Sequence, residues 1–145
     1  MISGHLKTGD TETQQKFMEY IKPRKIFIVN ADLGFSQSLK GYLTRTVKHE
    51  VQYFENCEDC LKNITDAPEI VIISHFQKSS ENDASKGIEI LEIIKKNYPE
   101  AHIIVIADHE GYGTAMQTIL KGAEQYVIKD KDTFEKITVM LNELN

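Results

Sequence analysis

From Lys25 to the end of the chain, short β-rich apolar runs alternate with segments of helical periodicity. This alternation is typical of a doubly wound α/β domain built on a parallel sheet. The runs Ile70–Ile73 and Ile103–Ile106 are continuously apolar, as expected for strands that helices cover on both faces. Five strands are predicted, at Lys25–Val29, Glu50–Phe54, Glu69–Ile73, His102–Ile106 and Gln125–Ile128.

Apolar residues between and after these strands recur at helical spacing and predict five helices. The helical stretches are Phe35–Val47, Cys57–Ile64, Ile90–Ile94, Ala115–Leu120 and Phe134–Leu144. The 145 residues suit one domain over residues 25–145, after an N-terminal extension over residues 1–24 with a possible short helix at Thr11–Ile21. The polar segment Gln77–Lys86 is predicted as a long loop, either covering the ligand-binding edge of the sheet or acting as a solvated spacer.

Charge and hydropathy exclude several classes of protein. The formal net charge of −5 argues against nucleic-acid binding, which relies on Lys and Arg to neutralise phosphates. No apolar run approaches the ~18 residues that a membrane span requires, and Met1–Asp10 contains no signal-like hydrophobic stretch. We therefore expect a cytoplasmic protein without membrane or nucleic-acid partners.

The spacing of Cys57 and Cys60 occurs in redox and zinc motifs. Asn56, however, is suited to cap a helix in which both cysteines share an apolar face with Leu61. The five histidines supply no second ligand pair at motif spacing. Buried or half-buried thiols are therefore predicted, rather than a redox centre or a metal site.

In an open parallel sheet, ligands bind beyond the carboxyl ends of the strands. Neither GxGxxG nor GxxxxGK[ST] occurs in the sequence, so no glycine-rich cradle for a nucleotide phosphate is predicted. The residues expected at this edge are Asn30, Ala31, Asp32, Ser74, His75, Ala107, Asp108, Lys129 and Asp130.

Three segments resemble the receiver domains of bacterial response regulators. Lys25–Asp32 is similar to the family's first strand and acidic pair, and Pro68–Ser74 to the strand that ends in the phospho-accepting aspartate. Gly122–Lys129 is similar to the last strand, with its switch aromatic and its phosphate-pairing lysine. The resemblance implies a flavodoxin-like receiver architecture with strand order 2-1-3-4-5.

Four positions that the family uses for phosphorylation are replaced. By this resemblance, the metal-binding acidic pair corresponds to Asn30 and Ala31, the acceptor to Ser74, and the phosphate-following hydroxyl to Ala107. Mg²⁺ favours carboxylate oxygens, and phosphoryl transfer depends on that ion to neutralise developing charge. The sequence therefore predicts a degenerate pocket that takes no metal and no phosphoryl group.

The resemblance also identifies residues that are kept. Lys129 matches the phosphate-pairing lysine and Tyr126 the switch aromatic, while Asp32 is a remaining carboxylate. With no phosphate to contact, Lys129 is expected to pair with Asp32 or Asp108. Tyr126 is expected to serve as a partly buried packing residue.

These features favour an atypical receiver domain of two-component phosphorelay signalling, not phosphorylated and not an enzyme. It would act through contacts with other signalling proteins at its fourth helix, last strand and last helix, with a homodimer left open. One alternative is a phosphate-responsive switch with an altered acceptor. Another is a flavodoxin-like cofactor-binding protein, although no cofactor is predicted.

Overall fold

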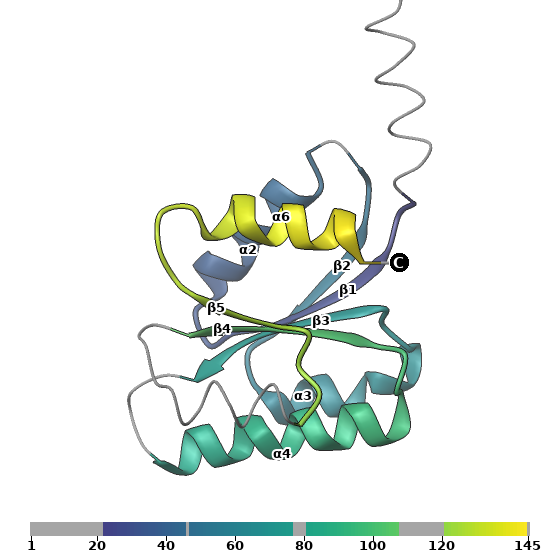
Figure 1. Cartoon of the computed structure of the whole chain (residues 1–145), viewed down its shortest axis with the longest axis vertical. Coiled ribbons are helices and arrows are strands. Elements are labelled where there is room, and N and C mark those ends of the chain that lie inside the picture. The colour runs from purple at the N-terminus through teal and green to yellow at the C-terminus, as the bar shows by residue number, and fades with distance from the viewer. Residues whose placement is uncertain (1–21, 46, 77–80, 108–120, 145) are drawn as a thin grey trace, which may run out of the picture.

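Five parallel strands form the centre of the computed structural model, which describes residues 22–45, 47–76, 81–107 and 121–144, with backbone alone for 75–76 and 81–88. The strands are β1 (Lys25–Val29), β2 (Glu50–Phe54), β3 (Ile70–Phe76), β4 (His102–Ala107) and β5 (Gln125–Ile128). Their order is β2-β1-β3-β4-β5, which confirms the predicted order (Figure 1).

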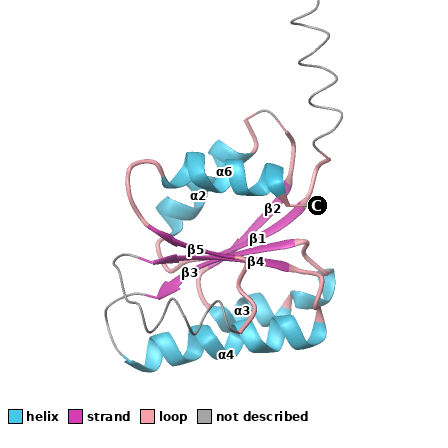
Figure 2. Cartoon of the chain, in the orientation of Figure 1, coloured by secondary structure: helices cyan, strands magenta, loops and turns pink. Residues whose placement is uncertain are grey.

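Helices cover both faces of the sheet. Helices α2 (Leu33–Leu43) and α6 (Thr133–Glu143) lie on one face, and α3 (Cys57–Lys62) and α4 (Glu81–Asn97) on the other (Figure 2). A short 3-10 helix, η1 (Ile64–Asp66), follows α3. The described residues thus contain four α-helices where five helices were predicted, because Ala115–Leu120 lies outside them, as does Thr11–Ile21.

The apolar strands divide their side chains between two cores, because successive residues of a strand point to opposite faces. Phe27, Val71 and Ile103 pack with the α4 residues Leu91 and Ile94 on one face. The next residues along each strand, Ile28, Ile72 and Ile104, pack with residues of α2 and α6 on the other. This division explains why β3 and β4 read as unbroken apolar runs.

Several element boundaries differ from the prediction, such as the end of α2 at Leu43 instead of Val47, and two of them bear on the site: the start of α4 and the end of β3. Helix α4 begins at Glu81, so the predicted loop Gln77–Lys86 is helical over residues 81–86, while residues 77–80 lie outside the described chain. The sequence Glu81–Asp83 places acidic residue types where the helix dipole favours them. The extra polar residues therefore lengthen a helix that Leu91 and Ile94 anchor to the core.

Strand β3 is the second difference, because it continues to Phe76 instead of ending at Ile73. Its pairing with β4 shifts between Ile73 and Phe76, so β3 carries an irregularity of the β-bulge kind there. Ser74 consequently lies within β3, at the irregular step. Ala107, which was also predicted to follow its strand, is the last residue of β4.

Candidate functional site

The sheet brings four of the predicted pocket positions to its carboxyl edge. Val29 pairs with Ile73, so the residues that follow them, Asn30 and Ser74, lie on neighbouring strands. Ala107 pairs with Ile128, and the Lys129 N–H donates to the Ala107 carbonyl over 2.6 Å. The edge predicted from the sequence is therefore assembled as a single site.

Asn30 is engaged in organising the loop after β1. Its side chain is 1% exposed, and its Oδ1 accepts a hydrogen bond from the Asp32 N–H over 2.8 Å. The Asn30 N–H donates to the Phe54 carbonyl of β2 over 3.0 Å. A side-chain oxygen held in this way stabilises a turn, and as a neutral amide oxygen it is a weaker ligand for Mg²⁺ than a carboxylate.

Asp32, the remaining carboxylate, is the N-cap of α2. Its Oδ1 accepts from the Phe35 N–H over 3.1 Å, and its backbone is extended, as an N-cap requires. Such a cap is worth about 1 kcal/mol relative to alanine. The carboxylate therefore has a structural role that accounts for its presence.

Lys129 contacts an aromatic ring that the sequence did not indicate. Its Nζ lies 4.5 Å from the centre of the Phe35 ring, and Phe35 packs edge-on against Phe134 of α6 at 5.5 Å between ring centres. Between the described side chains of Lys129 and Asp32 there is no ion pair, and the other expected partner, Asp108, lies outside the described residues, so that alternative stays a prediction. Lys129 is exposed, so water solvates its ammonium, and the ring face adds an attraction of about 0.5–1 kcal/mol through its quadrupole.

Sequence reasoning missed the role of Phe35. It identified this residue only as part of a helical face, whereas the residue joins the cation of the pocket to α6. The sequence signal that could have indicated this role was an aromatic residue, Phe35, in the first turn of the helix that Asp32 caps. Only the pairing of β5 beside β4 brings Lys129 near it.

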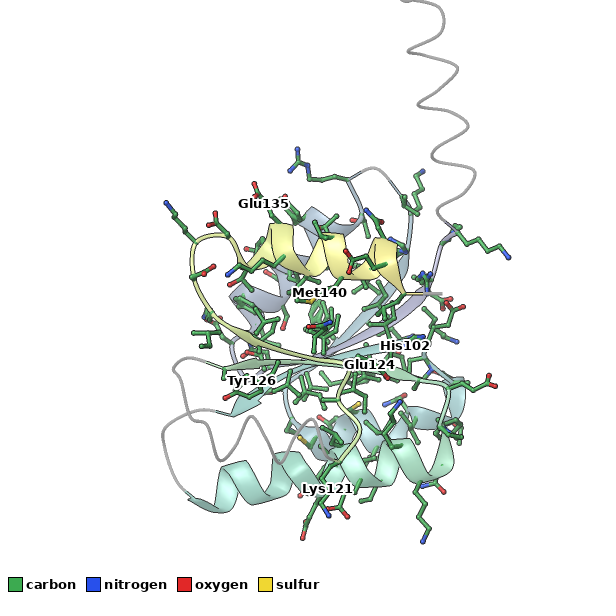
Figure 3. The ribbon with its side chains drawn as sticks, viewed as in Figure 1. His102, Lys121, Glu124, Tyr126, Glu135 and Met140 are labelled. Atoms are coloured by element: carbon green, nitrogen blue, oxygen red, sulfur yellow. The ribbon has the colours of Figure 1, made fainter. Side chains whose placement is uncertain are left out.

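Ser74 and Tyr126 both lie where packing accounts for them. Ser74 is 5% exposed, and Tyr126 is half-buried against the core cluster on the α3 and α4 face. Burial raises the pKa of the Tyr126 hydroxyl above its usual value. Figure 3 shows Tyr126 away from His102 and Glu124.

The pocket residues do not fit a magnesium ion. Ala31 has no side-chain ligand atom, Asn30 offers a neutral amide oxygen, and Ser74 offers a hydroxyl instead of a carboxylate. No cluster of three or more His, Cys, Asp or Glu suited to a metal occurs anywhere in the described part of the chain. The described residues at these positions therefore lack the paired carboxylates that Mg²⁺ favours.

The two cysteines pack as predicted. Cys60 is buried and Cys57 is half-buried on α3, whose N-cap Asn56 accepts from the Asp59 N–H over 2.8 Å. Burial, and then the neighbouring Cys57, raise the pKa of the Cys60 thiol to about 12. Because the thiolate is the reactive form, Cys60 is chemically inert near neutral pH.

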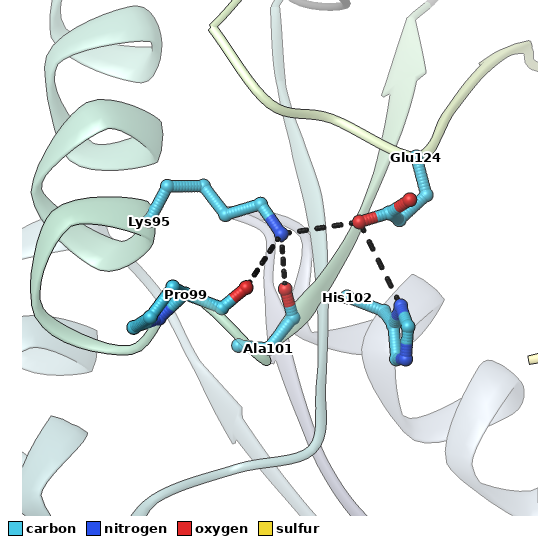
Figure 4. A network of polar contacts seen from close by, with 5 residues as sticks. All are labelled: Lys95, Pro99, Ala101, His102 and Glu124. Atoms are coloured by element: carbon cyan, nitrogen blue, oxygen red, sulfur yellow. Dashed lines mark hydrogen bonds and ion pairs between the residues drawn. The ribbon is translucent and has the colours of Figure 1, made fainter. Parts of the chain in front are cut away.

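A polar network that the sequence did not reveal lies at the opposite, amino-terminal edge of the sheet (Figure 4). Lys95 Nζ donates to the carbonyls of Pro99 at 3.2 Å and Ala101 at 2.7 Å, and pairs with Glu124 Oε1 at 3.1 Å. His102 Nδ1 lies 3.6 Å from the same carboxylate oxygen. The network joins the end of α4 to the starts of β4 and β5, far from the ligand-binding edge, so its role is structural.

His49 at this edge makes stability depend on pH. Its Nδ1 accepts from the Arg24 N–H over 2.9 Å, so the ring is neutral in this arrangement. Burial, followed by the charge of Arg24, lowers the pKa of His49 below 6.5, while Glu69 opposes this. Below pH 6.5 His49 is therefore protonated more in the unfolded chain than in the folded protein. The free energy of unfolding falls as the pH decreases from 6.5 toward the lower pKa of His49 in the folded protein.

We expect the free energy of unfolding to fall between about pH 7 and about pH 5.5, and to fall less in His49→Asn. The asparagine oxygen can still accept from Arg24 but does not titrate. Urea unfolding of both proteins at the two pH values measures the difference. An equal pH dependence in the two proteins would show that His49 is not responsible.

The fold is of the CheY type, because it is a five-stranded parallel sheet of order β2-β1-β3-β4-β5 with helices on both faces. Comparison with known proteins supports this assignment. No protein-family model matches the sequence. The chain is 31% identical over 113 residues to an NtrX-like response regulator of Rickettsia typhi, covering 75% of this chain and 23% of the relative. It is 25% identical over 118 residues to the DNA-binding transcriptional regulator NtrC of Proteus hauseri, covering 79% and 23%.

Solved receiver domains have the same fold. The receiver domain of NtrX from Brucella abortus matches with a TM-score of 0.67 and 25% identity, over 83% of this chain and 99% of that one. The BeF3-activated DrrB receiver domain matches with a TM-score of 0.71 at 21% identity, over 84% and 97%, a likeness of fold alone. The chain carries a receiver domain of the two-component response-regulator type, and it spans about a quarter of the length of the curated relatives it matches.

Proposed function

We propose that this receiver domain is not phosphorylated at its acceptor position and that it signals by binding other proteins. The observation that carries the proposal is that Asn30, Ala31 and Ser74, at the positions of the acidic pair and the acceptor, supply no carboxylate. A lysine that pairs with a phosphoryl group needs to be free to reach it. Here the exposed ammonium of Lys129 rests on the Phe35 ring, a contact worth about 0.5–1 kcal/mol, and Asp32 Oδ1 caps α2.

Residues on both sides of the pocket support the same proposal. Ala107 has no hydroxyl to follow a phosphoryl group, and Ser74 has no carboxylate to accept one. Tyr126 is packed against the core cluster. We infer a non-enzymatic, cytoplasmic signalling module that takes no cofactor. No described helix is long and apolar enough to cross a membrane.

Magnesium binding is the first test of the proposal. Ligands that bind only the folded state raise the melting temperature. We expect millimolar Mg²⁺ to leave the melting temperature of the protein unchanged, relative to sodium chloride at equal ionic strength, because the pocket lacks a carboxylate pair. A magnesium-specific rise would instead favour the rival function, a phosphate-responsive switch with an altered acceptor.

A further inference from the structure

A groove lies at the amino-terminal edge of the sheet, around the polar network of Figure 4. Its volume is about 1120 Å³, slightly above the range of about 300–1,000 Å³ of small-ligand pockets, so it has room for a polypeptide segment. Tyr98 is half-buried there, because its ring packs in part against the core between the sheet and α4. The apolar or small lining residues are Pro23, Ala67, Pro68, Tyr98, Pro99 and Ala101.

All three prolines of the chain line this groove. Pro23 precedes β1, Pro68 precedes β3 and Pro99 precedes β4, so the parallel topology gathers them at one edge. Proline has a fixed φ and no N–H, so these walls offer apolar surface in a rigid arrangement. A rigid surface loses little conformational entropy on binding, which favours a docked segment.

Ion pairs neutralise most of the charge that lines the groove. Arg24 Nη1 lies 3.8 Å from Glu69 Oε2, and Lys95 Nζ lies 3.1 Å from Glu124 Oε1. Besides His102, the charged lining residues are three cations and three anions, namely Lys22, Arg24, Lys95, Glu69, Glu100 and Glu124. A balanced surface of this kind does not select a polyanion, and it suits a segment whose own charges balance.

The segment before Lys22 has the composition to fill this groove. Phe17, Tyr20 and Ile21 are spaced i, i+3 and i+4, so the helix predicted over Thr11–Ile21 would present them on one face. Residues 13–21 contain one basic and one acidic residue, so this stretch is also charge-balanced. Its apolar face and its balanced charge match the groove.

The start of the described chain places this segment next to the groove. Lys22, the first described residue, is itself part of the lining, and Ile21 precedes it in the sequence. Phe17 is five residues before Lys22, which corresponds to about 17 Å of extended chain and less in a helix. The three apolar side chains of the segment are therefore within reach of the lining residues.

We propose that the segment Thr11–Ile21 docks in this groove of the same chain through its apolar face. Because the segment is tethered at Lys22, its effective concentration at the groove is of millimolar order, whereas the segment of a second copy is present only at the protein concentration. A contact too weak to hold a free peptide is thus populated within one chain. The docked segment covers Tyr98 beside the ion pair that joins α4 to the start of β5.

Nuclear magnetic resonance spectra of the full chain test the docking. The wild type is compared with Phe17→Ser/Tyr20→Ser/Ile21→Ser, which removes the apolar face of the segment. We expect the methyl resonance of Ala67 and the amide resonance of Tyr98 to shift, because the aromatic rings of the segment, and their ring currents, leave the groove.

The matched control is Glu12→Ser/Gln15→Ser/Glu19→Ser, which places the same residue type on the other side of the same predicted helix. This control should leave the groove resonances in place. Amide resonances at the opposite edge of the sheet, such as those of Asn30 and Lys129, should not move in either variant.

Trypsin cleavage after Lys16 gives a second readout, because proteolysis follows the population of the undocked segment. We expect Ala67→Asp/Pro99→Asp, which places carboxylates in the apolar walls, to speed this cleavage at least about fivefold. Ala67 has a φ of +55°, a conformation that aspartate tolerates. The charge-matched control Ser38→Asp/Val139→Asp, at exposed positions of α2 and α6, should be cleaved within about twofold of the wild-type rate.

Three results would overturn the inference. It is wrong if the two segment variants shift the same groove resonances, or if cleavage after Lys16 is equally fast in the wild type and the groove variant. It is also wrong if an equimolar mixture of labelled and unlabelled chain shows contacts of the segment only between copies. Thermal unfolding of every variant checks that the domain is folded. The inference is independent of the proposed function, which fails on a phosphate adduct instead.

Discussion

Replacing Gly122 with alanine should lower the free energy of unfolding by about 2–3 kcal/mol. Gly122 has a φ of +112°, which residues with a side chain rarely adopt. An added Cβ would also lie 2.8 Å from Lys95 Cγ, where the lysine stem passes on its way to Glu124. Urea unfolding of Gly122→Ala measures the loss.

Gly41 provides the matched control for this substitution. It lies in the last turn of α2 and is exposed, and no atom outside its own helix comes within 4 Å of an added Cβ. Gly41→Ala should therefore raise the free energy of unfolding by about 0.5–1 kcal/mol, because alanine loses less backbone entropy in a helix. Equal effects of the two substitutions would contradict the backbone and packing described at Gly122.

Restoring the carboxylates of the pocket should proceed in a fixed order. Ser74→Asp alone should gain neither metal binding nor phosphorylation, because Asn30 and Ala31 still supply no acidic pair. Adding Asn30→Asp and Ala31→Asp gathers three carboxylates at one edge. Their repulsion should destabilise the metal-free triple variant. Mg²⁺ at about a hundredfold excess over its Kd should then stabilise it by about 2.7 kcal/mol.

The first measurement is thermal unfolding of the single and triple variants with and without Mg²⁺. The second is the intact mass of each variant after incubation with acetyl phosphate. We expect metal binding to appear first, phosphorylation next, and coupling to Tyr126 only after Ala107→Thr supplies a hydroxyl. Phosphorylation of the Ser74→Asp single variant would show that the acidic pair is not what the pocket lacks.

The sequence predicted the sheet well because buried parallel strands carry a strong signal. β1, β2 and β5 begin and end at the predicted residues, and the strand order agrees. The irregular end of β3 was not predictable, since Ser74 reads as a strand end and the bulge depends on pairing with β4. The start of α4 was missed because residues 81–86 are polar and lack apolar periodicity.

The candidate site was predicted in position but not in its contacts. Asn30, Ser74, Ala107 and Lys129 share the predicted edge, because the carboxyl ends of parallel strands lie together. The partner of Lys129 could not be read from the sequence, since a charge-based argument considers carboxylates and overlooks the face of an aromatic ring such as Phe35.

Intact-mass spectrometry of the wild-type protein after incubation with acetyl phosphate and Mg²⁺ tests the central claim most directly. The pocket combines an uncharged acceptor, Ser74, with a lysine held over Phe35, so the mass should remain that of the unmodified chain. A stoichiometric phosphate adduct that disappears in Ser74→Ala would contradict this account and identify the domain as a working phosphate switch.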